Sequence, residues 1–211
     1  MSEGASGGNR FARLLADPVV ERIRSALESH QPLGAADATD AAEVRRAAVA
    51  LIFRLGTEER VELLLIKRAE YQSDPWSGQI AFPGGREEPG DSSLAETAAR
   101  ETREETGIDL SRDGMILGRL DDLRPRTVRL PAIVVRPFVA ILDRNEPLEL
   151  SPEVALAFWI PFGALAHTES WQEDTVTARG VQVNARVFRH QDHVVWGMTE
   201  RIMTQLLTLI A

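Results

Sequence analysis

The chain has 211 residues, of which 44% are hydrophobic, so it is long enough to bury the core of one large domain. Its 32 acidic and 24 basic residues give a formal net charge of −8, which argues against nucleic acid as a partner, because phosphate backbones are bound by basic surfaces. Cysteine is absent, which excludes disulfides, thiolate metal sites and cysteine nucleophiles. A polar N-terminus and the lack of any apolar run near about 18 residues predict a cytoplasmic protein without a membrane partner.

The N-terminal part, residues 1–43, is expected to hold a disordered segment followed by one helix. The helix is predicted over residues 17–30, where Asp17 precedes a proline and can cap the first turn. Its apolar residues recur at helical spacing, which predicts one buried face: Val20, Ile23 and Leu27. We therefore treat this part as a helical extension of the domain that follows.

Residues 44–211 mix strands and helices without a regular strand-helix-strand rhythm. Strands are predicted over 44–55, 61–68, 79–83, 115–120, 132–142, 155–161, 181–188 and 193–197. Helices are predicted over 92–106 and 199–210, with a short one over 161–167. This order predicts a single α+β domain.

The segment ARETREETG, residues 99–107, concentrates charge on the second predicted helix. At about 100° per residue, Glu101, Glu104 and Glu105 share one face of this helix. Leu94 and Ala98 lie on the same stripe, so the acidic patch continues a side that faces the protein interior. Because like charges at this spacing repel one another, we expect a positive group to answer them.

Arg100 is one candidate for that positive group. At a spacing of four residues it is predicted to reach Glu96 and Glu104, which leaves Glu101 and Glu105 without an equivalent partner on the helix. Two interpretations remain open at this point. The helix is either a solvated face with internal ion pairs, or one side of a Mg²⁺ or Mn²⁺ site, since such ions bridge carboxylates to substrate phosphates.

A glycine-rich loop, FPGGREEPGDSS (82–93), leads directly into this helix, and Asp91 or one of the two serines after it is available as a cap. Gly84 and Gly85 allow close approach of the backbone, so a carbonyl oxygen there is a candidate metal ligand. The loop is not a phosphate-binding P-loop, because no Gly-Lys-Ser/Thr follows it. Loop and helix together favour the metal site.

These residues resemble the Nudix hydrolase signature. The stretch RETREETGI, residues 100–108, matches the second half of the Nudix box except at Thr102, where an aliphatic residue is usual. The first half runs from Gly85 through five residues to Asp91 and through eight more to Arg100, one residue longer than the usual box. That longer spacing is similar to the coenzyme A pyrophosphatase branch, and so is WGMT at residues 196–199.

The resemblance implies a fold, a reaction and a cofactor. The fold is an α/β/α sandwich with a mixed sheet, and the reaction is hydrolysis of a diphosphate with Mg²⁺ or Mn²⁺ as cofactor. The implied metal ligands are Glu101, Glu104, Glu105 and the backbone at Gly85. In the Nudix pattern Arg100 orients a metal-binding glutamate. The general base varies within the superfamily, and Glu104 and Glu153 are the two candidates here.

Candidate substrate-binding residues lie outside the box: Arg68 and Arg126 for phosphate, and Trp76 for stacking on a base. A structural ion pair is an equally good role for each arginine, and packing is at least as good a role for Trp76. The implied partner is a small-molecule diphosphate, with coenzyme A or an acyl derivative first. The branch's usual arginine between Arg68 and Gly78 is missing, so ADP-ribose, a nucleotide sugar or a dinucleoside polyphosphate stays open. A Nudix-fold binding domain without hydrolysis is a third hypothesis, and a homodimer is compatible with the family.

Overall fold

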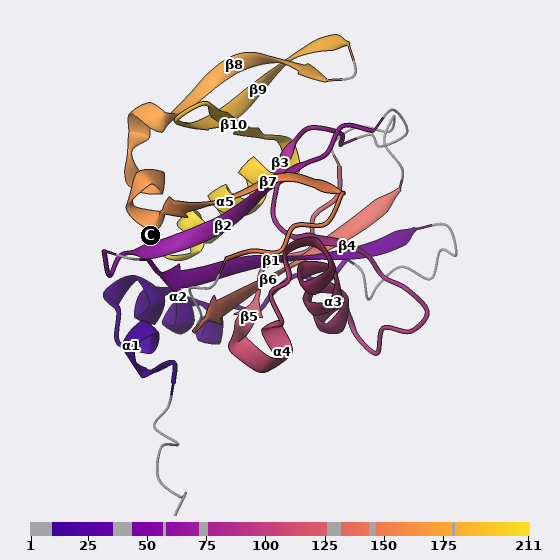
Figure 1. Ribbon diagram of the computed structural model, residues 1–211. Coiled ribbons are helices and arrows are strands. Elements are labelled where there is room, and N and C mark those ends of the chain that lie inside the picture. Colours follow the sequence, from indigo (N-terminus) through magenta and orange to yellow (C-terminus); the bar gives the residue numbers. More distant parts are fainter. Residues whose placement is uncertain are drawn as a thin grey trace, which may run out of the picture.

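The structure is a computed structural model that describes residues 10–35, 44–56, 58–71, 76–125, 132–143, 147–178 and 180–211. Within these residues seven strands form one mixed sheet (Figure 1). They are β1 (Arg45–Leu55), β2 (Val61–Arg68), β3 (Ile80–Ala81), β4 (Gly84–Arg86), β5 (Gly114–Arg119), β6 (Ile133–Leu142) and β7 (Val154–Pro161). The predicted α+β class with a mixed sheet is confirmed.

β1 lies at the centre of this sheet. It pairs in parallel with β6, and antiparallel with β2 and with β4. β5 extends the sheet beyond β6, while β3 and β7 both pair with β2. β1 and β6 consist almost entirely of buried residues, because both faces of a central strand are covered.

Helices cover the two faces of the sheet and produce the expected three layers. On one face lie α1 (Ala12–Leu15), α2 (Pro18–Ser29) and α5 (Gly197–Leu209), which share a core with Leu51 and Phe53 of β1. On the other lie α3 (Leu94–Thr106) and α4 (Leu110–Asp113), which pack on Ala50 and Ile52. In Figure 1, α3 stands in front of the central strands and α5 behind them.

The predicted N-terminal helix is confirmed, and so is its cap. The Asp17 side chain accepts hydrogen bonds from the backbone of Val19 and Val20, which satisfies two N–H groups of the first turn. Val20, Ile23 and Leu27 are buried as predicted. The disorder expected for residues 1–10 falls almost wholly outside the described residues.

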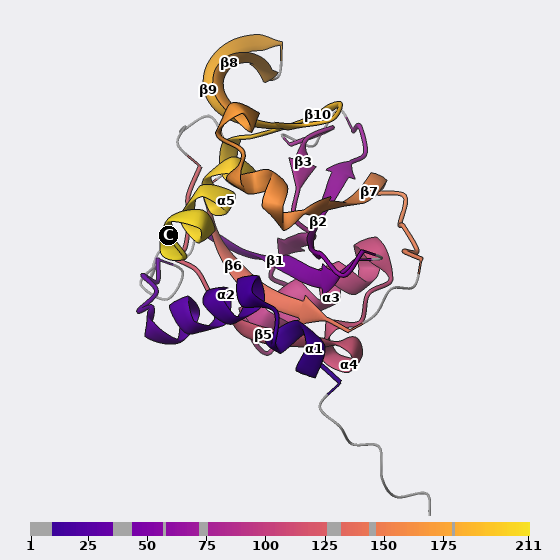
Figure 2. The same ribbon diagram turned by 90° about the vertical axis from the view of Figure 1, so that its left-hand side faces the viewer.

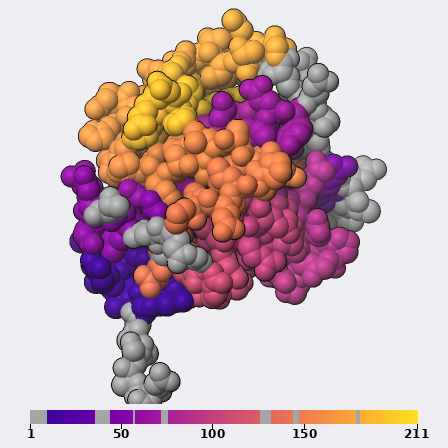
Figure 3. All heavy atoms as spheres, viewed as in Figure 1, coloured from indigo at the N-terminus to yellow at the C-terminus, as the bar shows by residue number. Residues whose placement is uncertain are grey.

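The described residues also form a second, three-stranded sheet. Its strands are β8 (Trp171–Ala178), β9 (Val181–His190) and β10 (His193–Trp196). The predicted β9–β10 hairpin is confirmed, whereas β8 was not predicted. Figure 2 shows β8 and β9 as a curved hairpin that stands away from the body. In the space-filling view of Figure 3, orange and yellow atoms of the C-terminal part form the upper end of the molecule, and the indigo N-terminal part lies at the lower left.

The short predicted helix after β7 is a 3-10 helix, Phe162–Ala166, followed by a second one, Thr168–Ser170. α3 begins two residues later than predicted, because Ser93 is its N-cap and accepts a hydrogen bond from the Glu96 N–H. α3 ends at Gly107, whose φ of 75° is the left-handed conformation that glycine adopts readily. No helix among the described residues combines the length and the hydropathy that crossing a membrane requires.

Candidate active site

A cleft of about 320 Å³ opens where the main sheet divides. The first half of β1 pairs with β4, from Ala47 opposite Arg86 to Val49 opposite Gly84, whereas its end pairs with β2. At the division the Ala50 N–H donates to the Pro83 carbonyl oxygen at 2.9 Å. Because β3 and β4 separate here, residues from both faces of the sheet reach one cavity.

Three carboxylates lie at one end of this cleft: Glu101, Glu105 and Glu153. The first two project from neighbouring turns of α3. Glu153 precedes β7, and its carbonyl oxygen accepts a hydrogen bond from the Ala69 N–H at 2.8 Å, which holds it beside the end of β2. The pairing of β7 with β2 therefore brings a residue about fifty positions away in sequence to the helix that carries the acidic box.

The other end of the cleft is apolar. Ala47 and Val49 of β1 and Ile133 and Val135 of β6 form its floor. Its walls come from Trp76 and from the first turns of α5, with Met198, Thr199 and Ile202. The cleft is thus acidic where α3 meets the glycine turn and apolar where α5 begins.

Glu105 is the most buried of the three carboxylates, with 3% of its surface exposed. Its Oε2 accepts a hydrogen bond from the Gly84 N–H at 2.9 Å, and Arg68 Nη1 lies 3.8 Å from Oε1. Burial raises the pKa of Glu105 to about 7; the Gly84 bond and the charge of Arg68 oppose the rise, while Glu101 and Glu153 add to it. A buried group that is half-protonated near neutral pH is typical of a functional site.

Glu101 lies against the glycine turn. A Cβ atom on Gly85 would stand 2.3 Å from the Glu101 Cδ, so only glycine leaves room for this carboxylate. Burial raises the pKa of Glu101, and the charges of Glu104 and Glu153 raise it further, against the opposing effect of Arg100. Gly85 therefore acts as a spacer that lets backbone and carboxylate meet.

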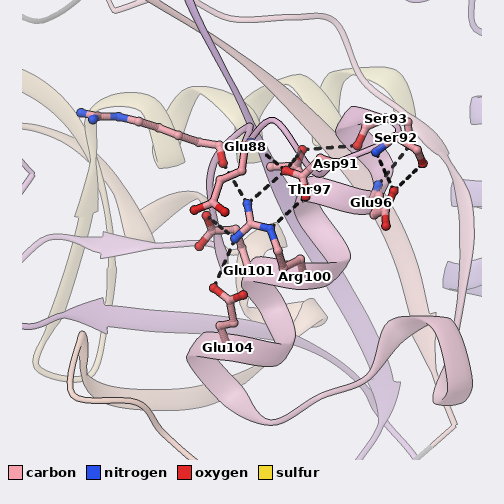
Figure 4. A network of polar contacts seen from close by, with 10 residues as sticks. Glu88, Asp91, Ser92, Ser93, Glu96, Thr97, Arg100, Glu101 and Glu104 are labelled. Carbon is pink, nitrogen blue, oxygen red and sulfur yellow. Dashed lines mark hydrogen bonds and ion pairs between the residues drawn. The ribbon is translucent and has the colours of Figure 1, made fainter.

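Arg100 organises the start of the box (Figure 4). Its Nε and Nη2 donate to Asp91 at 2.9 and 3.1 Å, and Nη2 also donates to the Arg86 carbonyl oxygen at 3.0 Å. This pairing with Arg100 lowers the pKa of Asp91 and raises that of Arg100. The glycine loop and the helix are thereby joined by one side chain.

Two expectations about Arg100 were wrong. It does not contact Glu96, whose carboxylate instead accepts hydrogen bonds from Ser92 at the start of the helix. Glu101 does have a partner on the helix, because Arg100 Nη1 donates to it at 3.1 Å. The predicted contact with Glu104 is present at 3.2 Å. The periodicity of the helix did not anticipate that Asp91 in the loop turns the guanidinium away from Glu96.

Glu104 differs from the other box glutamates. Its side chain is 55% exposed and does not line the cleft. Arg68 and Trp76 do line it, as expected for substrate-binding residues, although Trp76 also packs on the apolar floor. Arg126 lies outside the described residues.

The donor set at the acidic end suits a hard divalent cation. Among the described residues, no three acidic or histidine side chains are close enough, as placed, to hold a metal ion. Glu101, half-buried, and Glu105, buried, nevertheless lie one turn apart on α3, and burial raises the pKa of both carboxylates. Oxygen-rich sites of this kind bind Mg²⁺ or Mn²⁺.

Sequence reasoning gave no role in the site to Arg86, Thr199 or Ile202, which all line the cleft. Thr199 donates from its hydroxyl to the Ile80 carbonyl oxygen at 3.0 Å, which joins α5 to β3. The WGMT stretch was noted only as a similarity, and its last two residues, Met198 and Thr199, form part of the cleft wall. The alternation of β4 could have placed Arg86, had this three-residue strand been recognised.

The fold and the site define an α+β protein with a carboxylate-lined cleft beside a glycine turn. A sequence profile of the NUDIX domain matches residues 44–180. The chain belongs to the Nudix family. It is an enzyme of the class that hydrolyses phosphoric anhydrides.

Two relatives agree with the family, and one solved structure shares the fold. The chain is 33% identical over 144 residues to the uncharacterized Nudix hydrolase NudL of Photorhabdus laumondii, covering 68% of this chain and 74% of the relative. It is 31% identical over 145 residues to NudL of Yersinia pestis, covering 68% and 70%. A crystal structure of a MutT/nudix family protein from Enterococcus faecalis shares the fold, with a TM-score of 0.54, 16% identity and coverage of 99% of this chain and 76% of that one.

Proposed function

We propose that this Nudix hydrolase cleaves the diphosphate of coenzyme A or an acyl-coenzyme A, releasing 3′,5′-ADP and 4′-phosphopantetheine. The observation that carries the proposal is the division of the cleft into an acidic and an apolar end. The acidic end suits a metal-bound diphosphate, and the apolar end suits the flat base of a nucleoside. The long box spacing and WGMT, whose Met198 and Thr199 line the apolar end, favour coenzyme A within the family.

The proposed cofactor is Mg²⁺ or Mn²⁺, held by Glu101, Glu105 and the backbone at Gly85. Glu104 joins them in this proposal when its exposed side chain leaves Arg100. When bound, such an ion neutralises charge that develops on the leaving phosphate and lowers the pKa of water. Arg100 positions Glu101 through the hydrogen bond from Nη1, while Asp91 holds the other side of its guanidinium.

Glu153 is the general base that the geometry favours over Glu104. Its carboxylate lines the cleft beside Glu101 and Glu105, and it comes from a different element, so it approaches the diphosphate from another side. Glu104 is half-exposed and bound to Arg100, which suits a metal ligand better than a base. Arg68, close to Glu105 at the mouth of the acidic end, is proposed to bind a substrate phosphate, and Trp76 to face the base.

A second candidate function keeps the chemistry and changes the substrate to ADP-ribose, a nucleotide sugar or a dinucleoside polyphosphate. The observation behind it is the missing arginine between Arg68 and Gly78, where Gln72 or Ser73 stands near its place. Those two positions lie outside the described residues. A binding domain without hydrolysis is less well supported, since Glu101, Glu104 and Glu105 are all present.

The test is a substrate panel with Mg²⁺, with Mn²⁺ and with a chelator. Coenzyme A and acetyl-coenzyme A are compared with ADP-ribose, a nucleotide sugar and a dinucleoside polyphosphate by kcat/KM. The expected result is the highest value for a coenzyme A substrate, with 3′,5′-ADP as product and no turnover under chelation. A higher value for another substrate selects the second candidate, and no turnover of any diphosphate overturns both.

The remaining assignments are proposals as well. Residues 44–211 are proposed as the catalytic domain, with 1–43 as its N-terminal extension, although α2 contributes to the same core as β1. A cytoplasmic location and a homodimer are compatible with the proposed substrate. Analytical ultracentrifugation of the full chain measures the oligomeric state directly.

A further inference from the structure

The floor of the apolar end is a patch of sheet whose register is known. Ala47 of β1 pairs with Arg86 of β4 on one side and with Val135 of β6 on the other. Residues paired across neighbouring strands project from the same face. Arg86 therefore stands on the cleft face of the sheet, in the same row as Ala47 and Val135, and it lines the cleft.

A second arginine lies on this face. Arg45 is two residues before Ala47 on β1, so its side chain projects to the same side, and it pairs with Ile133. Arg45 and Arg86 are diagonal neighbours across β1 and β4. The Cα atoms of such neighbours are generally about 7–8 Å apart, a distance that long side chains bridge. Both arginines are exposed, while Ala47, Ile133 and Val135 between and beside them are buried.

The two guanidinium groups have no acidic partner among the residues that the structure describes. The arginine between them in sequence behaves differently: Arg46 projects to the opposite face and pairs with Glu87 at 2.6 Å. The register thus places two like charges on neighbouring strands beside the apolar floor, and a dianion is the ligand whose charge matches them. Arginine binds phosphate oxygens in pairs, which makes a phosphate monoester the matching ligand.

We propose that Arg45 and Arg86 bind a phosphate monoester on the nucleoside end of the substrate, apart from the diphosphate at α3. This inference rests on the proposed function. Coenzyme A carries a 3′-phosphate on its ribose, whereas ADP-ribose, nucleotide sugars and dinucleoside polyphosphates carry none. With the base on the apolar floor, the two arginines select substrates by this phosphate and distinguish the two candidate functions.

The kinetic test compares coenzyme A with 3′-dephospho-coenzyme A. Arg45→Gln, Arg86→Gln and the double variant remove charge and keep most of each apolar stem. We expect the wild type to prefer coenzyme A in kcat/KM by about 10- to 100-fold, as expected for charge-assisted hydrogen bonds. In the double variant the preference is lost because kcat/KM for coenzyme A falls. Its kcat/KM for the dephospho substrate stays within about twofold of the wild-type value.

Arg46→Gln is the matched control, because it removes the same charge from the same strand on the opposite face. It keeps the wild-type preference. An unchanged preference in the double variant overturns the inference. An equal fall for both substrates also overturns it, since the arginines then act on the diphosphate or on the fold.

A binding measurement separates this inference from the proposed function. Isothermal titration calorimetry of the full chain compares 3′,5′-ADP with 5′-AMP, and neither ligand needs turnover. If coenzyme A is not hydrolysed but 3′,5′-ADP binds more tightly than 5′-AMP in an Arg45- and Arg86-dependent manner, the function fails and the phosphate site stands. If coenzyme A is hydrolysed and the variants bind both nucleotides as the wild type does, the site fails and the function stands.

Discussion

Two clusters of arginine and carboxylate, each with at least one buried carboxylate, differ in their balance of charge. In one, Asp122 is fully buried and receives hydrogen bonds from Arg136 at 2.8 and 3.0 Å and from the Ala35 N–H, with Arg119 at 3.7 Å. In the other, a single guanidinium, that of Arg100, serves Asp91 and two glutamates of α3. Among the contacts between described residues, one carboxylate faces two arginines in the first cluster, and three carboxylates share one arginine in the second.

The difference separates a structural cluster from a functional one. The Asp122 carboxylate accepts hydrogen bonds from the segment after α2 and from β6, so this cluster joins two parts of the fold. The Arg100 cluster leaves negative charge unanswered, and Glu105 and Glu153 add to it at the same cleft. Burial of charge is common to both, so burial alone does not identify the site. An excess of negative charge beside an open cleft does identify it.

The largest expected effect is loss of activity in Glu105→Gln. The amide oxygen still accepts the hydrogen bond from the Gly84 N–H, but the charge that a cation needs is gone. We expect kcat/KM to fall about 10³-fold, because a bound metal contributes several kcal/mol to the transition state. Without metal, the melting temperature of Glu105→Gln should be at least that of the wild type, because a buried carboxylate that is repelled by its neighbours has been removed. Activity within tenfold of wild type would contradict the role of Glu105.

The Asp122→Asn variant should behave in the opposite way. The substitution removes the buried negative charge that Arg136 and Arg119 face, and we expect a loss of about 3 kcal/mol in the free energy of unfolding. Urea titration measures this loss. Activity per folded molecule should stay near that of the wild type. A stable Asp122→Asn variant with little activity would mean that the two clusters are not distinct in role.

The pH dependence of stability offers a third test. The pKa of Glu105 is raised to about 7 in the folded protein, so the folded state holds a proton that the unfolded chain releases near pH 4.5. The stability that this bound proton adds to the folded state is fully present below pH 4.5. It is lost as the pH rises through 7, and the loss is at most about 3 kcal/mol. Metal-free wild type should therefore lose stability over this window. Glu105→Gln should lose less, and identical slopes would refute the assignment.

A smaller effect is expected for Gly85→Ala. The added Cβ would meet the Glu101 carboxylate, which must move, and we expect kcat/KM to fall about 10- to 100-fold. Gly90→Ala is the matched control in the same loop, because a Cβ there meets nothing within 4 Å. Both variants should stay folded by circular dichroism. Equal activities in the two variants would show that the space beside Gly85 has no role in the reaction.

The sequence predicted the local elements well because their signals are local. Asp17 before a proline, the buried stripe of α2 and the alternation of β9 all follow from neighbouring residues. β8 was missed because WQEDTVTA is polar and nearly all of its pairing is with one neighbouring strand, so it lacks the apolar pattern of a core strand. Its pairing with β9 is visible only in three dimensions.

The site was predicted in part for the same reason. The box on α3 is one helix face, so Glu101 and Glu105 could be grouped from spacing. Glu153 reaches them only through the pairing of β7 with β2, and the resemblance to a family rather than the spacing suggested it. Arg45 and Arg86 are neighbours only because of the register between β1 and β4, which are distant in sequence. No local pattern encodes that register.

The central claim is that the excess carboxylate at the cleft is completed by a divalent cation. Mn²⁺ binding followed by electron paramagnetic resonance tests it without knowledge of the substrate. The account predicts that wild type and Asp122→Asn bind Mn²⁺ alike, whereas Glu101→Gln and Glu105→Gln each bind it at least about tenfold more weakly. Equal Mn²⁺ affinity in the wild type and both glutamate variants would contradict it.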